Sequence, residues 1–147
     1  MPEQPNTWAL LDQDDPGGII LRLGASEFFF EHGVSRWDQS RWPALASELL
    51  DPVSGVYPVL REDRALSLEG SAAATVLLEV CSFDFAGLLM GKQALARRAV
   101  VMTLMVGIAV MVVAQGDEPE RVYRIWCDPS YGESLQAALL AIVTELP

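Results

Sequence analysis

Sixteen consecutive residues without a charge, Ala99 to Ala114, constrain the fold more than any other part of this sequence. A transmembrane helix needs about 20 apolar residues, so this run is short for a membrane span. Valine occurs repeatedly in it and favours extended chain, and Gly107 divides it into two pieces of ordinary strand length. The run therefore predicts a buried β-hairpin in preference to a membrane helix. We expect its methionines to fill gaps in the core: Met102, Met105 and Met111.

The segments on either side of this hairpin show a regular order of strands and helices. Residues 65–70 have the pattern of a strand, and Ser71 is expected to be the N-cap of a helix that follows directly. Residues 122–127 alternate as a strand does, and Ser130 is expected to open a final amphipathic helix. The order strand, helix, three strands, helix predicts an α+β fold in which helices cover a mixed or antiparallel sheet.

The first part of the chain is less regular. Residues 1–17 contain three prolines and are expected to form an N-terminal arm that lies on the protein's own body or on a partner. Residues 18–147 are expected to form a single α+β domain. Residues 19–23 and 26–31 predict a second hairpin, around a Gly-Ala turn, that extends or flanks the main sheet.

Two further short elements are expected between the hairpin and the main sheet. Pro43 suits the first turn of a helix over residues 43–50, where Leu45 and Leu49 are four apart. Residues 56–60 predict a short strand between prolines and glycines.

The charge balance excludes several classes of partner. Twenty acidic and ten basic residues give a net charge of −10, and Lys92 is the only lysine. No basic stripe is present to neutralise phosphates, so we expect neither nucleic acid nor a membrane surface as a partner. The amino terminus lacks the basic start and apolar core of a secretory signal, which predicts a cytoplasmic protein. Cys81 and Cys127 are then expected to be buried thiols.

The sequence offers few groups for chemistry. His32 is the only imidazole, and nothing beside it suggests Ser-His-Asp or Cys-His catalysis. The acidic cluster of Asp12, Asp14 and Asp15 lacks the glycine and distal glutamate of a calcium loop. No glycine-rich phosphate loop joins a strand to a helix. We therefore assign no catalytic, cofactor-binding or metal-binding residue to this chain.

Two groups of residues are candidates for contact with a partner. Phe28, Phe29 and Phe30 make the second strand of the first hairpin apolar on both faces, which suits a core or a subunit contact. We expect Phe29→Asp to abolish assembly while leaving the fold intact. Arg97 and Arg98 could bind a phosphate or carboxylate, for example of a cofactor in a neighbouring subunit, or could cap the preceding helical segment.

Short motifs at the ends of the predicted elements carry a family resemblance. They are Leu66-Ser67-Leu68-Glu69-Gly70, Cys81-Ser82-Phe83-Asp84, Gly91 before Thr103, and Asp128-Pro129-Ser130-Tyr131-Gly132-Glu133-Ser134-Leu135. From Ala65 onward, just over half the chain resembles the gamma-subunit family of heterotetrameric sarcosine oxidase, itself similar to the folate-binding glycine-cleavage T-protein family. The resemblance implies a T-protein-like domain.

The resemblance also implies an accessory role. In that family the flavins (FAD and FMN), NAD and tetrahydrofolate belong to larger subunits, and the gamma subunit packs against them. This chain would then be a non-catalytic subunit of a flavin-dependent sarcosine oxidase or a related N-methyl amine oxidoreductase. One alternative is a stand-alone folate-dependent aminomethyl-transfer protein, with Asp84 as its candidate acidic residue. Another is a scaffold subunit of an unrelated multi-subunit oxygenase or dehydrogenase.

Overall fold

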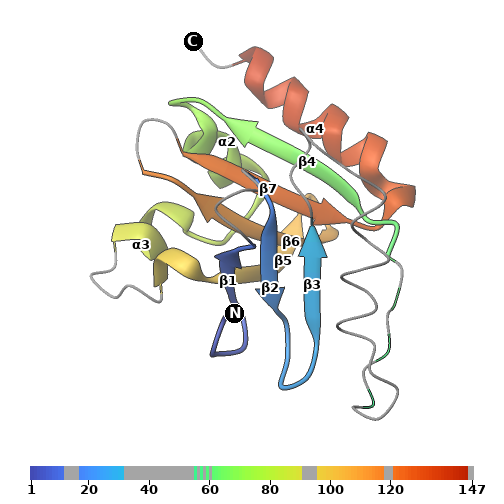
Figure 1. Ribbon diagram of the computed structural model, residues 1–147. Helices are drawn as coiled ribbons and strands as arrows, with labels where there is room; N and C mark the ends of the chain where they lie inside the picture. The colour runs from blue at the N-terminus through green and yellow to red at the C-terminus, as the bar shows by residue number, and fades with distance from the viewer. Residues whose placement is uncertain are drawn as a thin grey trace.

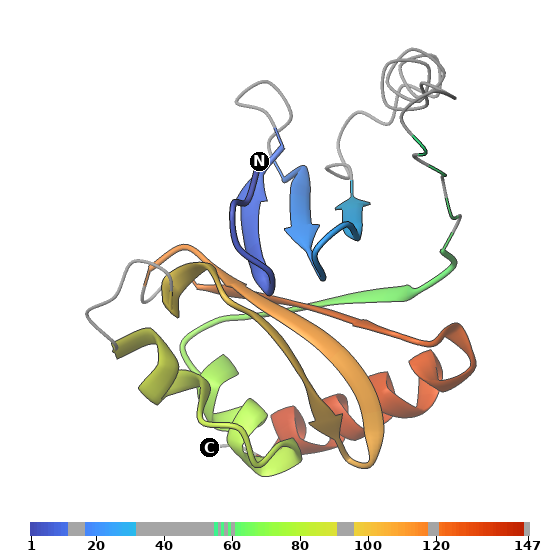
Figure 2. The ribbon, with the colours of Figure 1, turned by 90° about the horizontal axis from the view of Figure 1, so that it is seen from below.

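A four-stranded sheet lies at the centre of the protein, with helices on one face and a three-stranded sheet on the other (Figures 1 and 2). The computed structural model of the 147-residue chain describes residues 1–11, 17–31, 55, 57, 59, 61–90, 96–117 and 121–145. The expected helix at 43–50 lies outside these residues, as does most of the strand expected at 56–60.

The second half of the chain forms the four-stranded sheet and the helices that cover it. The strands are β4 (Arg64–Glu69), β5 (Val100–Met105), β6 (Ile108–Gln115) and β7 (Val122–Cys127). The helices are α2 (Ala73–Val80), α3 (Phe85–Met90), α4 (Gly132–Glu145) and the 3-10 helices η1 (Ala96–Arg98) and η2 (Pro129–Tyr131). The strands lie in the order β4-β7-β6-β5, and each neighbouring pair is antiparallel. The predicted α+β class is confirmed, with antiparallel strands and with α3 added to the expected order of elements.

The uncharged run forms the predicted hairpin. β5 and β6 pair from Val100–Val113 to Met105–Ile108, and Val106 and Gly107 form the turn. Both turn residues have positive φ, 44° and 84°, as a type I′ hairpin turn requires. No helix in the described ranges is long and apolar enough to cross a membrane.

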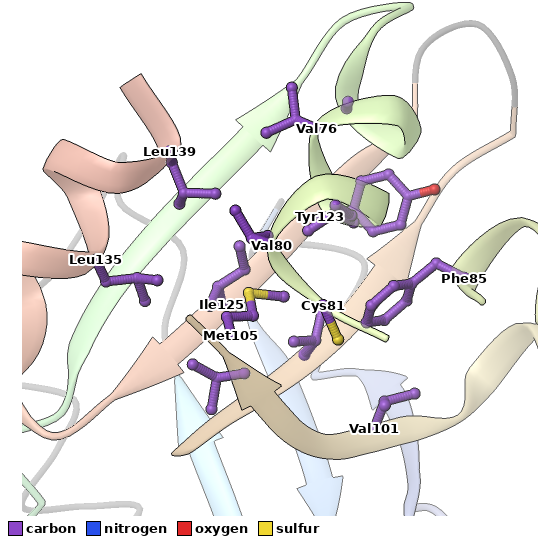
Figure 3. Close-up of a cluster of buried hydrophobic side chains, with 14 of the residues drawn as sticks. Val76, Val80, Cys81, Phe85, Val101, Met105, Tyr123, Ile125, Leu135 and Leu139 are labelled. Carbon is purple, nitrogen blue, oxygen red and sulfur yellow. The ribbon is translucent and has the colours of Figure 1, made fainter. Parts of the chain in front are cut away.

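The helices bury one face of the four-stranded sheet in a first hydrophobic core (Figure 3). α2 contributes Val76 and Val80, and α4 contributes Leu135 and Leu139, each pair four residues apart and therefore on one helix face. They pack in one cluster with alternate residues of β7, among them the fully buried Ile125. Burying one such side chain contributes about 1.5–3 kcal/mol, so this core holds the helices on the sheet.

Two expected helix starts differ from the structure. Ser71 is not the N-cap of α2, because the cap is Ala72 and makes no side-chain hydrogen bond. The chain turns into α2 at Gly70, whose carbonyl accepts a hydrogen bond from the Ala73 N–H. Ser130 lies in η2, and α4 begins two residues later. The capping carboxylate belongs to Asp128, which accepts a hydrogen bond from the Ser130 N–H at 2.9 Å.

The three-stranded sheet packs on the opposite face (Figure 2). Its strands are β1 (Thr7–Leu10), β2 (Ile19–Arg22) and β3 (Phe28–Glu31), antiparallel and in that order. The predicted hairpin is therefore confirmed as β2 and β3, and it flanks the main sheet. Residues 7–10 of the expected N-terminal arm form β1, so this part of the arm lies on the protein's own body. A second core joins the two sheets: Trp8, Ile19, Leu21, Val100, Met111, Val113 and Trp126.

Candidate functional site

An open groove of about 760 Å³ lies beside the three-stranded sheet, over the ends of β5, β6 and β7. Its apolar lining includes Met102, Leu104, Ala109, Met111 and Trp126 from the four-stranded sheet, and Leu23 from the turn after β2. Its ionisable lining consists of Glu27, Arg61, Asp63, Cys127 and Asp128. The groove thus combines an apolar floor with a rim that carries more acidic than basic groups.

The floor is apolar because β5 and β6 are apolar on both faces. Val101, Thr103 and Met105 point toward the helices and the first core. Val100, Met102 and Leu104 point to the opposite face of the sheet. On that face the three-stranded sheet covers Val100, but Met102 and Leu104 are each 58% exposed. The expectation that Met102 fills a gap in the core is therefore wrong, although Met105 and Met111 are buried as predicted.

Arg61 and Asp63, both on the rim, neutralise each other. The Arg61 guanidinium lies 2.8 Å from the Asp63 carboxylate, and it also stacks over the Phe29 ring at 5.5 Å from the centroid. Glu27 is exposed and has no ion-pair partner among the described residues. With Arg61 matched by Asp63, Glu27 and Asp128 leave the rim negative.

Asp128 keeps its charge over a wide pH range. Hydrogen bonds from the Ser130 hydroxyl and the Ser130 N–H favour its ionised form and lower its pKa below the usual 3.8. The neighbouring Cys127 behaves in the opposite way, because burial and the negative charges of Asp128 and Asp63 raise the pKa of its thiol. The thiol is therefore protonated at neutral pH and is a poor nucleophile.

β5 forms one edge of the four-stranded sheet beside this groove. The Val100 N–H donates to the Asn6 carbonyl at 2.8 Å, which shows that the backbone groups of Val100 point toward the open edge. Successive residues of a strand direct these groups to opposite sides, so those of Met102 and Leu104 point to the same edge. No partner within the described ranges accepts or donates there. As far as the described ranges go, the groove therefore borders strand backbone without a hydrogen-bond partner.

The groove is a candidate binding surface. Cys127 borders the groove, but its side chain is buried in the first core and its thiol is held protonated. The described residues contain no group of three or more His, Cys, Asp or Glu side chains placed to hold a metal ion. What the groove offers is apolar area, carboxylates and strand backbone, which are the elements of a peptide-binding surface.

The structure gives Phe29 a role within the fold. Its ring meets the Trp126 ring edge to face, with centroids 5.5 Å apart, and it packs against the second core. Phe28 lies beneath the Arg22 guanidinium at 5.5 Å, and Phe30 pairs with Ile20 across β2 and β3. All three phenylalanines are half-buried. Phe29→Asp would weaken the docking of the three-stranded sheet, so this substitution alone does not isolate a partner contact.

The two arginines lie away from the groove, in η1 just before β5. Arg97 is exposed and forms an ion pair of 3.2 Å with Asp117, which is also exposed. Arg98 is exposed beside it. The structure does not bring these arginines together with the phenylalanines of β3.

Asp84, the acidic candidate of the folate alternative, is exposed and does not line the groove. Its carboxylate accepts a hydrogen bond from the Gly87 N–H at 2.8 Å at the start of α3. A Cβ at Gly87 would lie 2.3 Å from the Asp84 Oδ2 atom, so a larger residue there would displace the Asp84 carboxylate from this hydrogen bond. His32 and the acidic cluster at residues 12, 14 and 15 lie outside the described residues.

Sequence reasoning did not identify the groove. Glu27, Arg61, Asp63 and Asp128 come from separate segments, and nothing in their spacing indicates that they converge. One signal was present in β5, whose residues are apolar on both faces without a charge or proline. A sheet edge of that kind is usually covered.

No family model matches the chain, and no curated protein matches it at a significant level.

Proposed function

We propose that this chain is a non-catalytic, gamma-type accessory subunit of a cytoplasmic, heteromeric flavin-dependent sarcosine oxidase or a related N-methyl amine oxidoreductase. Its role is to stabilise the assembly. FAD, FMN, NAD and tetrahydrofolate belong to the larger partner subunits. The observation that carries the proposal is the exposed apolar floor of the groove, with Met102 and Leu104, beside a stretch of strand edge that no described residue pairs with. Surfaces of this kind mark protein contacts.

The positions of the resembling motifs support the proposal. Residues 66–70 form most of β4 and the turn into α2, and residues 128–135 connect β7 to the start of α4. These are the points where strand meets helix, so they determine how α2 and α4 lie on the sheet. They are fold-determining positions, which agrees with a subunit that shares a family's fold without its chemistry.

The folate-dependent alternative receives less support. Its candidate residue, Asp84, is exposed, lies outside the groove and holds the first turn of α3, while the acidic side chains that line the groove are Glu27, Asp63 and Asp128. A scaffold subunit of an unrelated oxygenase or dehydrogenase would use the same groove, and it differs in the identity of its partner. The partner's cofactor therefore decides between the two accessory roles.

Purification of the tagged chain from its native host tests the proposal. Mass spectrometry of the co-purified proteins and an absorbance spectrum of the complex are the two readouts. We expect larger flavoprotein subunits and a flavin spectrum. Recovery of the chain alone and colourless, or with partners that carry no flavin, would contradict the proposal.

A further inference from the structure

The open edge of β5 and the groove beside it form one continuous surface. Met102 and Leu104 belong to both, because their side chains line the groove and their backbone groups point to the edge. We propose that this surface binds an extended segment of the larger partner subunit that carries a lysine or arginine. The inference rests on the proposed function, since it assigns the contact by which the accessory subunit joins its complex.

The backbone provides the first part of the contact. Beyond Val100, which is bonded to Asn6, the outward groups of Met102 and Leu104 have no partner within the described part of the chain. β5 contains no charge, proline or bulge of the kinds by which natural edge strands prevent pairing. A strand added alongside β5 would satisfy these groups and continue the sheet.

The groove provides the second part. Alternate side chains of an added strand would face the same side as Met102 and Leu104 and could enter the groove. The methylenes of a long cationic side chain would lie on these apolar residues, while its charge would approach the acidic rim. Glu27 and Asp128 make the groove negative and so attract that charge, and the hydrogen bonds from Ser130 keep Asp128 ionised.

Charge also selects the partner over a second copy of this chain. Each copy carries a net charge of −10, and pairing two β5 edges would bring two acidic grooves together. Like charges at such a contact repel, whereas a basic segment is attracted before it binds. The surface therefore fits a basic segment of a different subunit.

A defined peptide tests the surface on the full chain. The probe is a short peptide that alternates valine with lysine, and its controls alternate valine with glutamate or carry N-methyl groups on the pairing edge. We expect the lysine peptide to shift the NMR signals of the Met102 and Leu104 amides, with affinity that falls as salt rises. Both control peptides should leave these signals unchanged.

Two matched variants test whether this surface also holds the chain in its complex. Leu104→Lys places a positive charge on the edge, and Leu140→Lys makes the same change on α4 at a leucine that is 54% exposed. We expect Leu104→Lys to weaken peptide binding by about tenfold, or about 1.4 kcal/mol, and to reduce recovery of the flavoprotein partner. Leu140→Lys should change neither, and both variants should melt at the temperature of the parent.

The possible outcomes separate the two proposals. Undiminished recovery of the flavoprotein with Leu104→Lys would overturn the inference and leave the proposed function standing. If the unmodified chain recovers no flavoprotein, the proposed function fails. The peptide titration then still tests whether the surface binds a basic segment. Equal binding of the lysine and glutamate peptides, no binding, or a self-association that Leu104→Lys abolishes would each overturn the inference.

Discussion

The Arg124 guanidinium lies 2.7 Å from the Glu31 carboxylate, and this ion pair joins β7 of the four-stranded sheet to β3 of the three-stranded sheet. Arg124 also donates to the Gly17 carbonyl and lies over the Trp126 ring at 5.6 Å. The two charged side chains are only 11% and 23% exposed. The contact between the sheets therefore depends on a largely buried charge pair as well as on the second core.

Removing the negative charge of this pair should destabilise the protein. Glu31→Gln leaves the Arg124 guanidinium largely buried without its counter-charge, and we expect a loss of about 2 kcal/mol in the free energy of unfolding. Arg97→Gln is the control, because it breaks the exposed Arg97–Asp117 pair and should cost less than about 0.5 kcal/mol. Urea titrations measure both values, and equal losses would contradict the role of the buried pair.

The aromatic contact between the sheets gives a second prediction. Phe29→Ala removes the ring that meets Trp126 and should lower the free energy of unfolding by about 2 kcal/mol. Phe28→Ala removes a ring whose described contact is the Arg22 guanidinium, so its cost should be nearer 1 kcal/mol, or about the value of such a contact. Urea unfolding of the two variants, followed by tryptophan fluorescence, reports the difference. A larger loss for Phe28→Ala would refute this assignment.

The turn of the β5–β6 hairpin carries avoidable strain. Val106 is a β-branched residue at φ 44°, where asparagine is far better tolerated. We expect Val106→Asn to raise the free energy of unfolding by about 0.5–1 kcal/mol. Gly107→Ala, at φ 84°, should lower it. Thermal melts of the two variants should move in opposite directions, and a lower melting temperature for Val106→Asn would contradict the account.

The cysteines should resist modification in the folded protein. Cys81 and Cys127 are both free and buried, and the raised pKa of Cys127 keeps its thiolate fraction low at neutral pH. A chromogenic disulfide reagent should therefore label neither thiol until urea is added. Leu140→Cys provides an exposed thiol as the control. Labelling of a native cysteine as fast as that of the control would show that it is accessible.

Periodicity predicted most of the second half of the fold. β5, β6 and β7 were expected because their apolar residues recur over strand-length segments, and the Gly107 turn separates the first two. The helix starts were harder, because the chain enters α2 through backbone geometry at Gly70, whose φ is 107°, and not through the Ser71 side chain. Local backbone conformation of this kind leaves little trace in side-chain patterns.

The groove could not be predicted because it depends on which part of the four-stranded sheet the three-stranded sheet leaves uncovered. β5 is apolar on both faces, so its sequence alone does not show which face meets solvent. The three-stranded sheet is built from strands of four residues and reaches Val100 while leaving Met102 and Leu104 exposed. Glu27 and Asp128 line the same groove only because the two sheets are packed together.

Anaerobic titration of the complex purified through the tagged chain is the most direct test of the proposed function. The absorbance of its flavin is followed as sarcosine, or another N-methyl amine, is added in the absence of oxygen. The account predicts a flavin that co-sediments with this chain and is bleached by the amine, because two electrons pass from the amine to the flavin. A colourless chain that sediments alone, or a flavin that no N-methyl amine reduces, would contradict it.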